Sequence, residues 1–185
     1  MKFTPLLKKP TNYILLAIAI LGLILFIIIN QLIFGPLTQM VPSYGILDFE
    51  FAWTPEQVLI IFSAWGMSGM EAQTIGIYWD FLYILAYSSF IFSCILLVTR
   101  GLTGKFQAIG LWMSLTPIFS GIFDVIENIN LLILLNTAPN LSIFVSVLAS
   151  LSAGIKFGLL FIGIGFFFVA LIAFIIKFIK KRKSS

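Results

Sequence analysis

The sequence predicts an all-α fold: an integral membrane four-helix bundle with short interfacial helices on its outer side. Of the 185 residues, 61% are hydrophobic and only 10% are charged, whereas about half of an ordinary soluble domain is apolar and about a quarter is charged. The apolar residues gather into four stretches, each long enough to cross a hydrocarbon core about 30 Å thick as a helix. The polar segments between them are short, so we expect one membrane domain over residues 1–185.

The four expected spans are residues 13–34, 75–98, 106–135 and 153–176. Pro117 in the third span removes a backbone donor and is expected to kink that helix. The apolar stretch that contains the fourth span, 141–176, is too long for one upright helix. We therefore expect a break at residues 152–154, which leaves residues 141–151 as a short surface helix.

A second surface helix is expected over residues 55–65, between the first two spans. Thr54 is suited to cap a helix, and Pro55 fits the first helical position, where its missing N–H leaves no bond unmade. The segment is too short to cross a membrane. Gly66 and Gly69 then allow the chain to turn into the second span.

Positive charges indicate the orientation in the membrane. Except for Lys156, every Lys and Arg lies before the first span, between the second and third, or after the fourth, in the basic tail 177–185. The loops on the other side carry only acids: Asp48, Glu50, Glu56 and Glu71. Because cytoplasmic loops are enriched in Lys and Arg, we expect a multi-pass protein of the bacterial plasma membrane, in contact with the lipid bilayer, with both termini in the cytoplasm.

Two residue counts restrict the chemistry. There is no His, which excludes His-based catalysis and metal ligation, and a single Cys, Cys94, which excludes a disulfide within the chain and a multi-Cys zinc site. The apolar composition argues against a nucleic-acid partner despite a formal net charge of +4. Asp124 and Glu127 are ligands that a hard cation prefers, but the nearby Lys156 opposes a metal. We expect no metal and no cofactor.

Four ionisable residues lie inside the expected spans: Asp80, Asp124, Glu127 and Lys156. A charge in the hydrocarbon costs at least ~2.5–3.5 kcal/mol on insertion scales, so such residues are usually paired or functional. Counted from the ends of the spans, all four lie in the outer half of the membrane at overlapping depths, with Lys156 near the outer end of the fourth span. We therefore expect them to converge.

Helical spacing adds polar neighbours to these charges. In the second span two tyrosines follow Asp80 at the i+3 and i+7 positions of the same helix face. In the third span Glu127 and an asparagine follow Asp124 at the i+3 and i+4 positions. The candidate ligand or proton site therefore comprises Asp80, Tyr83, Tyr87, Asp124, Glu127, Asn128 and Lys156.

The charges in this group do not balance. Three carboxylates and one amine would carry −3 + 1 = −2 in a site of low dielectric constant, which is costly. Either a carboxyl keeps its proton, or a cation completes the group, or water reaches it. A network of ion pairs with a purely structural role is the alternative, but the excess of carboxyls over amines favours a binding site.

The same residues carry a resemblance. The run Trp79–Asp80–Phe81–Leu82–Tyr83 with Tyr87, the run Phe123–Asp124–Val125–Ile126–Glu127–Asn128, and Lys156 resemble a family of small bacterial four-span membrane proteins, over about residues 45–175. The resemblance implies a fold and a polar group rather than a reaction. A looser similarity is to the sterol isomerase and sigma-2 receptor-like bundles, which also carry intramembrane carboxylates.

The expected function is binding or passing a small cationic or amphiphilic ligand, or protons, in the outer half of the bundle. Two alternatives stay open. One is a membrane-embedded enzyme that acts on a lipid-like substrate with a carboxyl as general acid or base. The other is a structural membrane subunit whose charges only pair with each other. A cavity that reaches the charged residues favours the first two functions, and a tightly packed, fully satisfied network favours the third.

Overall fold

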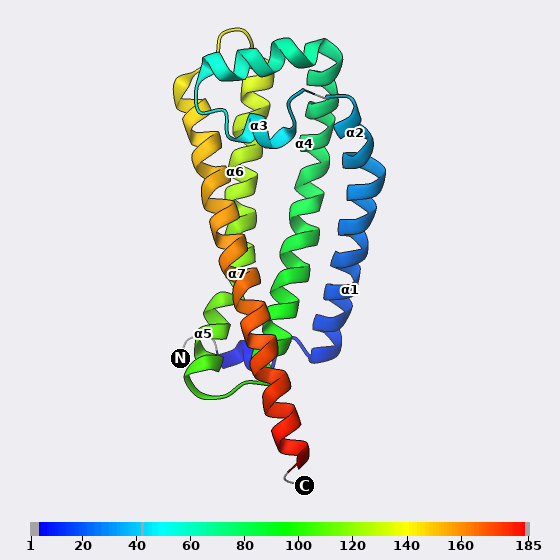
Figure 1. Cartoon of the computed structure of the whole chain (residues 1–185), viewed down its shortest axis with the longest axis vertical. Helices are drawn as coiled ribbons and strands as arrows, with labels where there is room; N and C mark the ends of the chain where they lie inside the picture. Colours follow the sequence, from blue (N-terminus) through cyan, green and yellow to red (C-terminus); the bar gives the residue numbers. More distant parts are fainter. Residues whose placement is uncertain (1–3, 42, 184–185) are drawn as a thin grey trace.

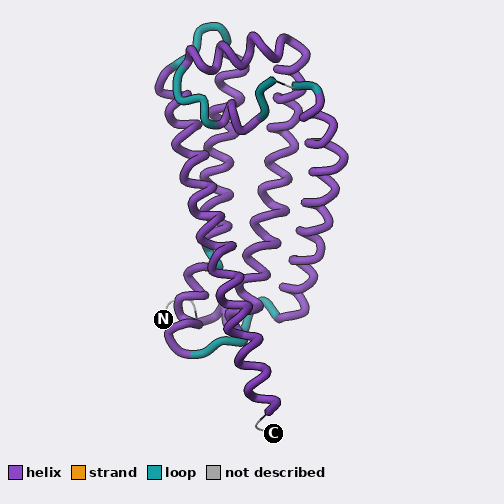
Figure 2. The backbone as a smooth tube through the Cα atoms, in the orientation of Figure 1, coloured by secondary structure: helices purple, strands orange, loops and turns teal. Residues whose placement is uncertain are grey.

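Helices dominate the part of the chain that the structure describes, residues 4–41 and 43–183. This computed structural model contains no strand over those residues (Figure 2). Lys2 and the last two residues of the expected tail 177–185 lie outside the described residues. In chain order the elements are η1 (Thr4–Leu7), α1 (Asn12–Ile29), η2 (Asn30–Phe34), α2 (Gly35–Gln39), α3 (Ile46–Glu50), α4 (Pro55–Arg100), α5 (Gly104–Met113), α6 (Thr116–Thr137) and α7 (Ile143–Lys183).

Four helices in the described residues are long and apolar enough to cross a membrane, and the all-α class is confirmed. They cover Asn12–Gln39, Pro55–Arg100, Gly104–Thr137 and Ile143–Lys180. Over most of their length they run side by side along the long axis of the molecule (Figure 1). Both ends of the chain lie where α5 lies, which we call the α5 end of the bundle; the opposite end is the α3 end (Figure 1).

The first long helix joins α1, the π-helical turn η2 and α2 without interruption. Thr11 caps its start, because its Oγ1 accepts a hydrogen bond from Ile14 N at 3.5 Å. Gly22 lets α1 approach α4 closely, since a Cβ atom there would lie 2.8 Å from the carbonyl oxygen of Ala86. The main helix contact of α1 is with α4, so this close approach attaches α1 to the bundle.

α4 has two parts that meet at Gly66. Thr54 caps the first part, with Oγ1 accepting from Gln57 N at 3.3 Å. Gly66 has φ 62° and ψ −175°, a conformation that glycine adopts readily and other residues rarely. The part before Gly66 lies across the α3 end, and the part after it runs down the bundle (Figure 1). Trp65 Nε1 donates to the carbonyl oxygen of Tyr44 at 2.7 Å, which fixes the crossing part over the loop below.

The third candidate span is divided at residues 114–115 into α5 and α6. Pro117 lies in the first turn of α6, where a proline removes no helical hydrogen bond because that N–H has no partner in any helix. The interruption therefore comes just before the proline rather than at it. Ser114 closes α5, with its Oγ donating to the carbonyl oxygen of Leu111 at 2.8 Å.

α7 overturns two expectations for the C-terminal part of the chain. It is one helix from Ile143 to Lys183, so the separate surface helix over 141–151 and the break at 152–154 are both absent. Ser152 and Ala153 are buried, and no proline lies between 143 and 183, so nothing ends the helix there. At 1.5 Å per residue the helix is about 60 Å long, and its last turns protrude beyond the other helices (Figure 1).

An apolar core fills the α3 end of the bundle. Its buried residues are Val41, Phe49, Ala52, Val58, Ile61, Phe62, Trp65, Ile77, Leu131, Leu134, Leu135 and Ala149. The ring of Phe49 meets those of Phe62 and Trp65 edge to face, with centroids 5.1 and 5.4 Å away. This packing holds the short helix α3 in place, and Glu50, its last residue, is buried beneath it.

Candidate functional site

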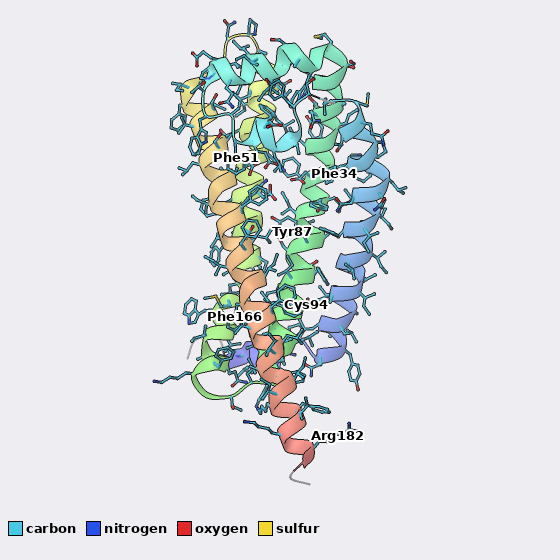
Figure 3. The ribbon with its side chains drawn as sticks, viewed as in Figure 1. Phe34, Phe51, Tyr87, Cys94, Phe166 and Arg182 are labelled. Carbon is cyan, nitrogen blue, oxygen red and sulfur yellow. The ribbon has the colours of Figure 1, made fainter. Side chains whose placement is uncertain are left out.

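A cavity of about 790 Å³ lies between α1 and α4 on one side and α7 on the other, and we call it the side cavity. Its polar lining residues are Asn30, Thr38, Glu50, Gln73, Asp80, Tyr83, Tyr87, Ser120, Asp124, Asn128 and Lys156. α1 and α7 both line it, yet α1 packs chiefly on α4 and α7 chiefly on α6, so the two helices make few contacts with each other. Figure 3 labels Tyr87 in this space, between α4 and α7.

Lys156 forms the centre of a buried ion-pair group, which we call the Lys156 cluster. Its Nζ lies 3.0 Å from Asp124 Oδ1, 2.9 Å from a Glu127 carboxylate oxygen and 3.3 Å from Glu50 Oε1. Lys156 is 6% exposed and Glu127 is 0% exposed. Nζ donates hydrogen bonds to Asp124 Oδ1 and Glu127 Oε1 and is paired by charge with Glu50.

Asp124 and the residues around it connect the Lys156 cluster to α4. Tyr87 Oη donates to Asp124 Oδ2 at 2.8 Å, so this carboxylate receives one bond from α4 and one from α7. Ser120 Oγ, one helical turn earlier, donates to the main-chain carbonyl oxygen of Lys156 at 2.8 Å. Lys156 is thus hydrogen-bonded to two neighbouring turns of α6, through its carbonyl oxygen to Ser120 and through Nζ to Asp124. These two bonds fix the position of Lys156 along that helix.

Asp80 belongs to a second group on the wall of the side cavity. Its Oδ2 accepts a hydrogen bond from Asn128 Nδ2 at 2.7 Å, so its polar partner is a neutral amide. Tyr83, three residues after Asp80, accepts a hydrogen bond through Oη from Asn30 Nδ2 at 3.0 Å. Asn30 Nδ2 also donates to the carbonyl oxygen of Phe26 at 3.0 Å. These bonds join the cavity-facing sides of α1, α4 and α6.

Aromatic rings surround Tyr83 at the cavity wall. Phe26 stacks on it with ring centroids 4.9 Å apart, and Phe34 meets it edge to face at 5.1 Å. Tyr87 lies one helical turn further on, at 5.8 Å. Phe34 ends the π-helical turn η2, a local widening of the helix that proteins often place at functional sites. The turn directs both Asn30 and Phe34 at Tyr83.

The structure brings all seven candidate residues from the sequence together, in two linked groups. Asp124, Glu127 and Lys156 form ion pairs, and Tyr87 joins them through Asp124. Asp80, Asn128 and Tyr83 line the adjoining wall of the cavity. Lys156 is deeper than expected: α7 rises about 20 Å from Ile143 to Lys156 at 1.5 Å per residue, so the lysine does not lie near the end of the helix.

Two residues of the site were not among the sequence candidates. Glu50 counted as a loop acid outside the spans, but it pairs with Lys156 at 3.3 Å. Its position between Phe49 and Phe51 is a signal of burial, because an isolated acid among large aromatic residues is seldom left in water. Asn30 appeared only as a polar interruption of the first span, and its two donated hydrogen bonds show its part in the cavity wall.

Glu50 is the carboxyl of the Lys156 cluster that faces the side cavity from α3. Burial is the largest influence on it and raises the pKa of Glu50 above its ordinary value of 4.5, against the lowering effect of Lys156. Its Oε2 atom is buried and has no hydrogen-bond partner among the described residues. With Glu50 included, three carboxylates surround one amine, and Asp80 adds a fourth nearby.

No family model, no curated protein and no solved structure matches this chain. The resemblance to small bacterial four-span proteins therefore stays a prediction. The site has to be interpreted from its own geometry.

We expect Lys156→Met to lower the free energy of unfolding by about 3–5 kcal/mol at about pH 8, because three buried carboxylates lose the cation they share. At about pH 5 the loss should be smaller, since carboxyls freed of their partner can take up protons. Chemical denaturation in detergent, followed by tryptophan fluorescence, measures both values. Lys105→Met, at an exposed lysine of α5, is the control and should stay within about 0.5 kcal/mol of wild type. Equal stability of Lys156→Met and wild type at both pH values would contradict the ion-pair group.

Glu50→Gln should change the pH dependence of stability in a definite direction. Because the pKa of Glu50 is raised by burial, its contribution to stability is fully present below the ordinary pKa and is lost as pH rises through the raised value. The glutamine variant has no such loss, so its stability relative to wild type should increase from about pH 5 to about pH 8. The same denaturation series measures this, with exposed Glu71→Gln as control. A relative loss of stability at the higher pH would show that the bridge to Lys156 outweighs burial.

Proposed function

We propose that this chain is a multi-pass membrane protein whose side cavity binds a small amphiphile, taken up from the bilayer between α1 and α7. The observation that carries the proposal is the division of one cavity into a charged wall and an apolar wall. Its volume lies within the range of about 300–1,000 Å³ common for small-molecule sites.

Apolar side chains on the outside of the bundle support insertion into a bilayer. In water they would form an apolar surface far larger than a monomeric soluble protein exposes, whereas hydrocarbon solvates them. Large apolar residues at least half exposed on α1 and α7 include Ile14, Leu16, Ile20, Leu21, Phe144, Phe161, Ile162, Val169 and Ile172. The charged residues of the long helices' central parts face inward, as intramembrane charges do.

The charge difference between the two ends supports an orientation with the α5 end in the cytoplasm. Lys177 Nζ donates to the carbonyl oxygen of Gly101 at 2.8 Å, and Arg100 donates to the carbonyl oxygen of Leu6 at 2.6 Å, so three basic segments meet at that end. The α3 end carries acids instead. By the positive-inside rule both chain ends are cytoplasmic, in the plasma membrane of a bacterium, and the side cavity lies toward the outer leaflet.

The walls of the cavity favour an amphiphile over a small ion. Near α3 the wall is formed by Glu50, Asp80 and Asp124, while further along α7 it becomes apolar, with Leu160, Ile164, Phe167 and Phe168. From Lys156 to Phe168 the helix rises about 18 Å, which suits an alkyl chain. A polar head then meets the carboxylates while the tail stays in apolar surroundings.

One observation also favours the membrane-embedded enzyme as a second candidate. Asp80 lines the cavity and is hydrogen-bonded to a neutral amide rather than paired with a cation, which leaves a carboxyl beside the bound head as a general acid or base. Mass analysis of the amphiphile after incubation with the protein tests this. A bound amphiphile recovered unchanged supports a binding module, and a changed mass supports the enzyme.

Filling the apolar wall should remove amphiphile binding. Ile164→Trp places an indole in the cavity and is expected to weaken binding of dodecyl amphiphiles by at least about tenfold, or about 1.4 kcal/mol. Ile162→Trp is the matched control, because Ile162 is 56% exposed on the outside of the same helix. Titration in lipid nanodiscs followed by native mass spectrometry measures retention of dodecylamine and dodecanol. The proposal fails if wild type retains neither, or if both variants retain them equally.

Cysteine labelling in intact cells checks the orientation. In a Cys94→Ala background, a cysteine at Ser43 or Asn140, both exposed at the α3 end, should react with a membrane-impermeant maleimide. A cysteine at the exposed Lys105 of the α5 end should react only after the cells are permeabilised. Labelling at Lys105 but not at Ser43 in intact cells would reverse the assigned orientation.

A further inference from the structure

The charged wall of the side cavity contains more acceptors than the chain itself supplies with donors. Lys156 donates hydrogen bonds to Asp124 and Glu127 and forms an ion pair with Glu50, so its ammonium group is directed at carboxylates of the chain itself. Asp80 receives its hydrogen bond from the neutral amide of Asn128. The charged wall therefore presents hydrogen-bond acceptors, and a ligand head that fits it donates hydrogen bonds.

One carboxylate oxygen of Glu50 lacks a hydrogen-bond donor. The residue lines the cavity, is 7% exposed, and its Oε2 has no hydrogen-bond partner among the described residues. A buried carboxylate oxygen without a donor is unfavourable. Its other oxygen, Oε1, is held by Lys156 at 3.3 Å, which fixes the carboxyl in position. Because Oε2 is buried, a donor in the cavity reaches it through a small turn of the carboxyl about its contact with Lys156.

Resting on the proposed function, we propose that the head of the amphiphile is a protonated amine, which donates N–H hydrogen bonds to Asp80 and to Glu50 Oε2. A primary ammonium supplies both the positive charge that offsets the excess carboxylates and the donors that they lack. A sulfate or phosphate head supplies neither and is repelled. A hydroxyl head supplies one donor without the charge, and a trimethylammonium head supplies the charge without a donor.

Aromatic rings beside Asp80 fit the same head. Tyr83 lies one turn from Asp80, and the rings of Phe26, Phe34 and Tyr87 lie within 4.9–5.8 Å of its ring, centroid to centroid. Ring faces attract ammonium groups through their quadrupoles. Leu160, Ile164 and Phe167 line the same cavity, and they provide apolar surroundings for a tail attached to the nitrogen.

A series of amphiphiles with one tail separates head recognition from tail binding. Wild-type protein in nanodiscs is titrated at about pH 8, where a simple alkylamine is mostly protonated, with dodecylamine, dodecyltrimethylammonium, dodecanol and dodecyl sulfate, and bound ligand is counted by native mass spectrometry. We expect dodecylamine to bind at least about tenfold more tightly than dodecanol or dodecyl sulfate, as a buried charge pair predicts. Dodecyltrimethylammonium should be intermediate, and binding equal to that of dodecylamine would overturn the N–H donation to Glu50.

Two variants assign the preference to the named carboxylates. Asp80→Asn should reduce dodecylamine affinity by about tenfold, toward that of dodecanol, and an unchanged far-UV circular dichroism spectrum shows that the variant is folded. Glu50→Gln should reduce the advantage of dodecylamine over dodecyltrimethylammonium, and exposed Glu71→Gln should change nothing. Dodecanol binding without any preference for dodecylamine overturns the head assignment alone. If no amphiphile binds, the proposed function fails and this inference fails with it.

Discussion

The Lys156 ammonium group is the interaction on which the site depends. It joins α7 to Asp124 and Glu127 of α6 and to Glu50 at the end of α3. In an apolar interior a charge of this kind is retained only if its partners are close and well directed. The same contact therefore sets the position of α7 along α6. It also holds the end of the short helix α3 at the side cavity. The wall of the cavity near α3 is therefore held by this ion pair together with the packing of Phe49 on Phe62 and Trp65.

The polar residues of α6 have two different roles. Glu127 is wholly buried behind the cavity and only pairs with Lys156, which is what a structural network predicts. Asn128, the next residue, points to α4 and holds Asp80 at the cavity wall, which is what a binding site predicts. Asp124 takes part in both, through Lys156 and Tyr87. The structural and ligand-binding interpretations thus describe different sides of one helix.

Helical spacing placed Asp124 and Glu127 on one face of their helix, because residues three apart are neighbours on a helix surface. The depth expected for Lys156 was counted from a break in the helix that is absent, so its contact with both carboxylates was expected from a start of the span that is wrong. Helical spacing could not place Glu50, since the packing of α3 against Phe62 and Trp65 depends on contacts between distant segments. The break expected in α7 rested on length alone. Nothing in a stretch free of proline ends a helix at the length of one span, and α7 continues from Ile143 to Lys183.

The attachment of α1 has a mechanical consequence. No residue of α1 takes part in the Lys156 cluster, and its main packing partner is α4, at the close approach of Gly22 to Ala86. Ion pairs join α3, α6 and α7, and Tyr87 of α4 donates a hydrogen bond to Asp124. α1 is held by van der Waals contact with α4, by the hydrogen bond from Asn30 to Tyr83, and by the hydrogen bond from Arg100 to Asn12 at its start. If the cavity widened to admit a bulky ligand, the contact between α1 and α4 would be strained first. The helices joined by the Lys156 cluster and by Tyr87 would then keep their positions while α1 moves.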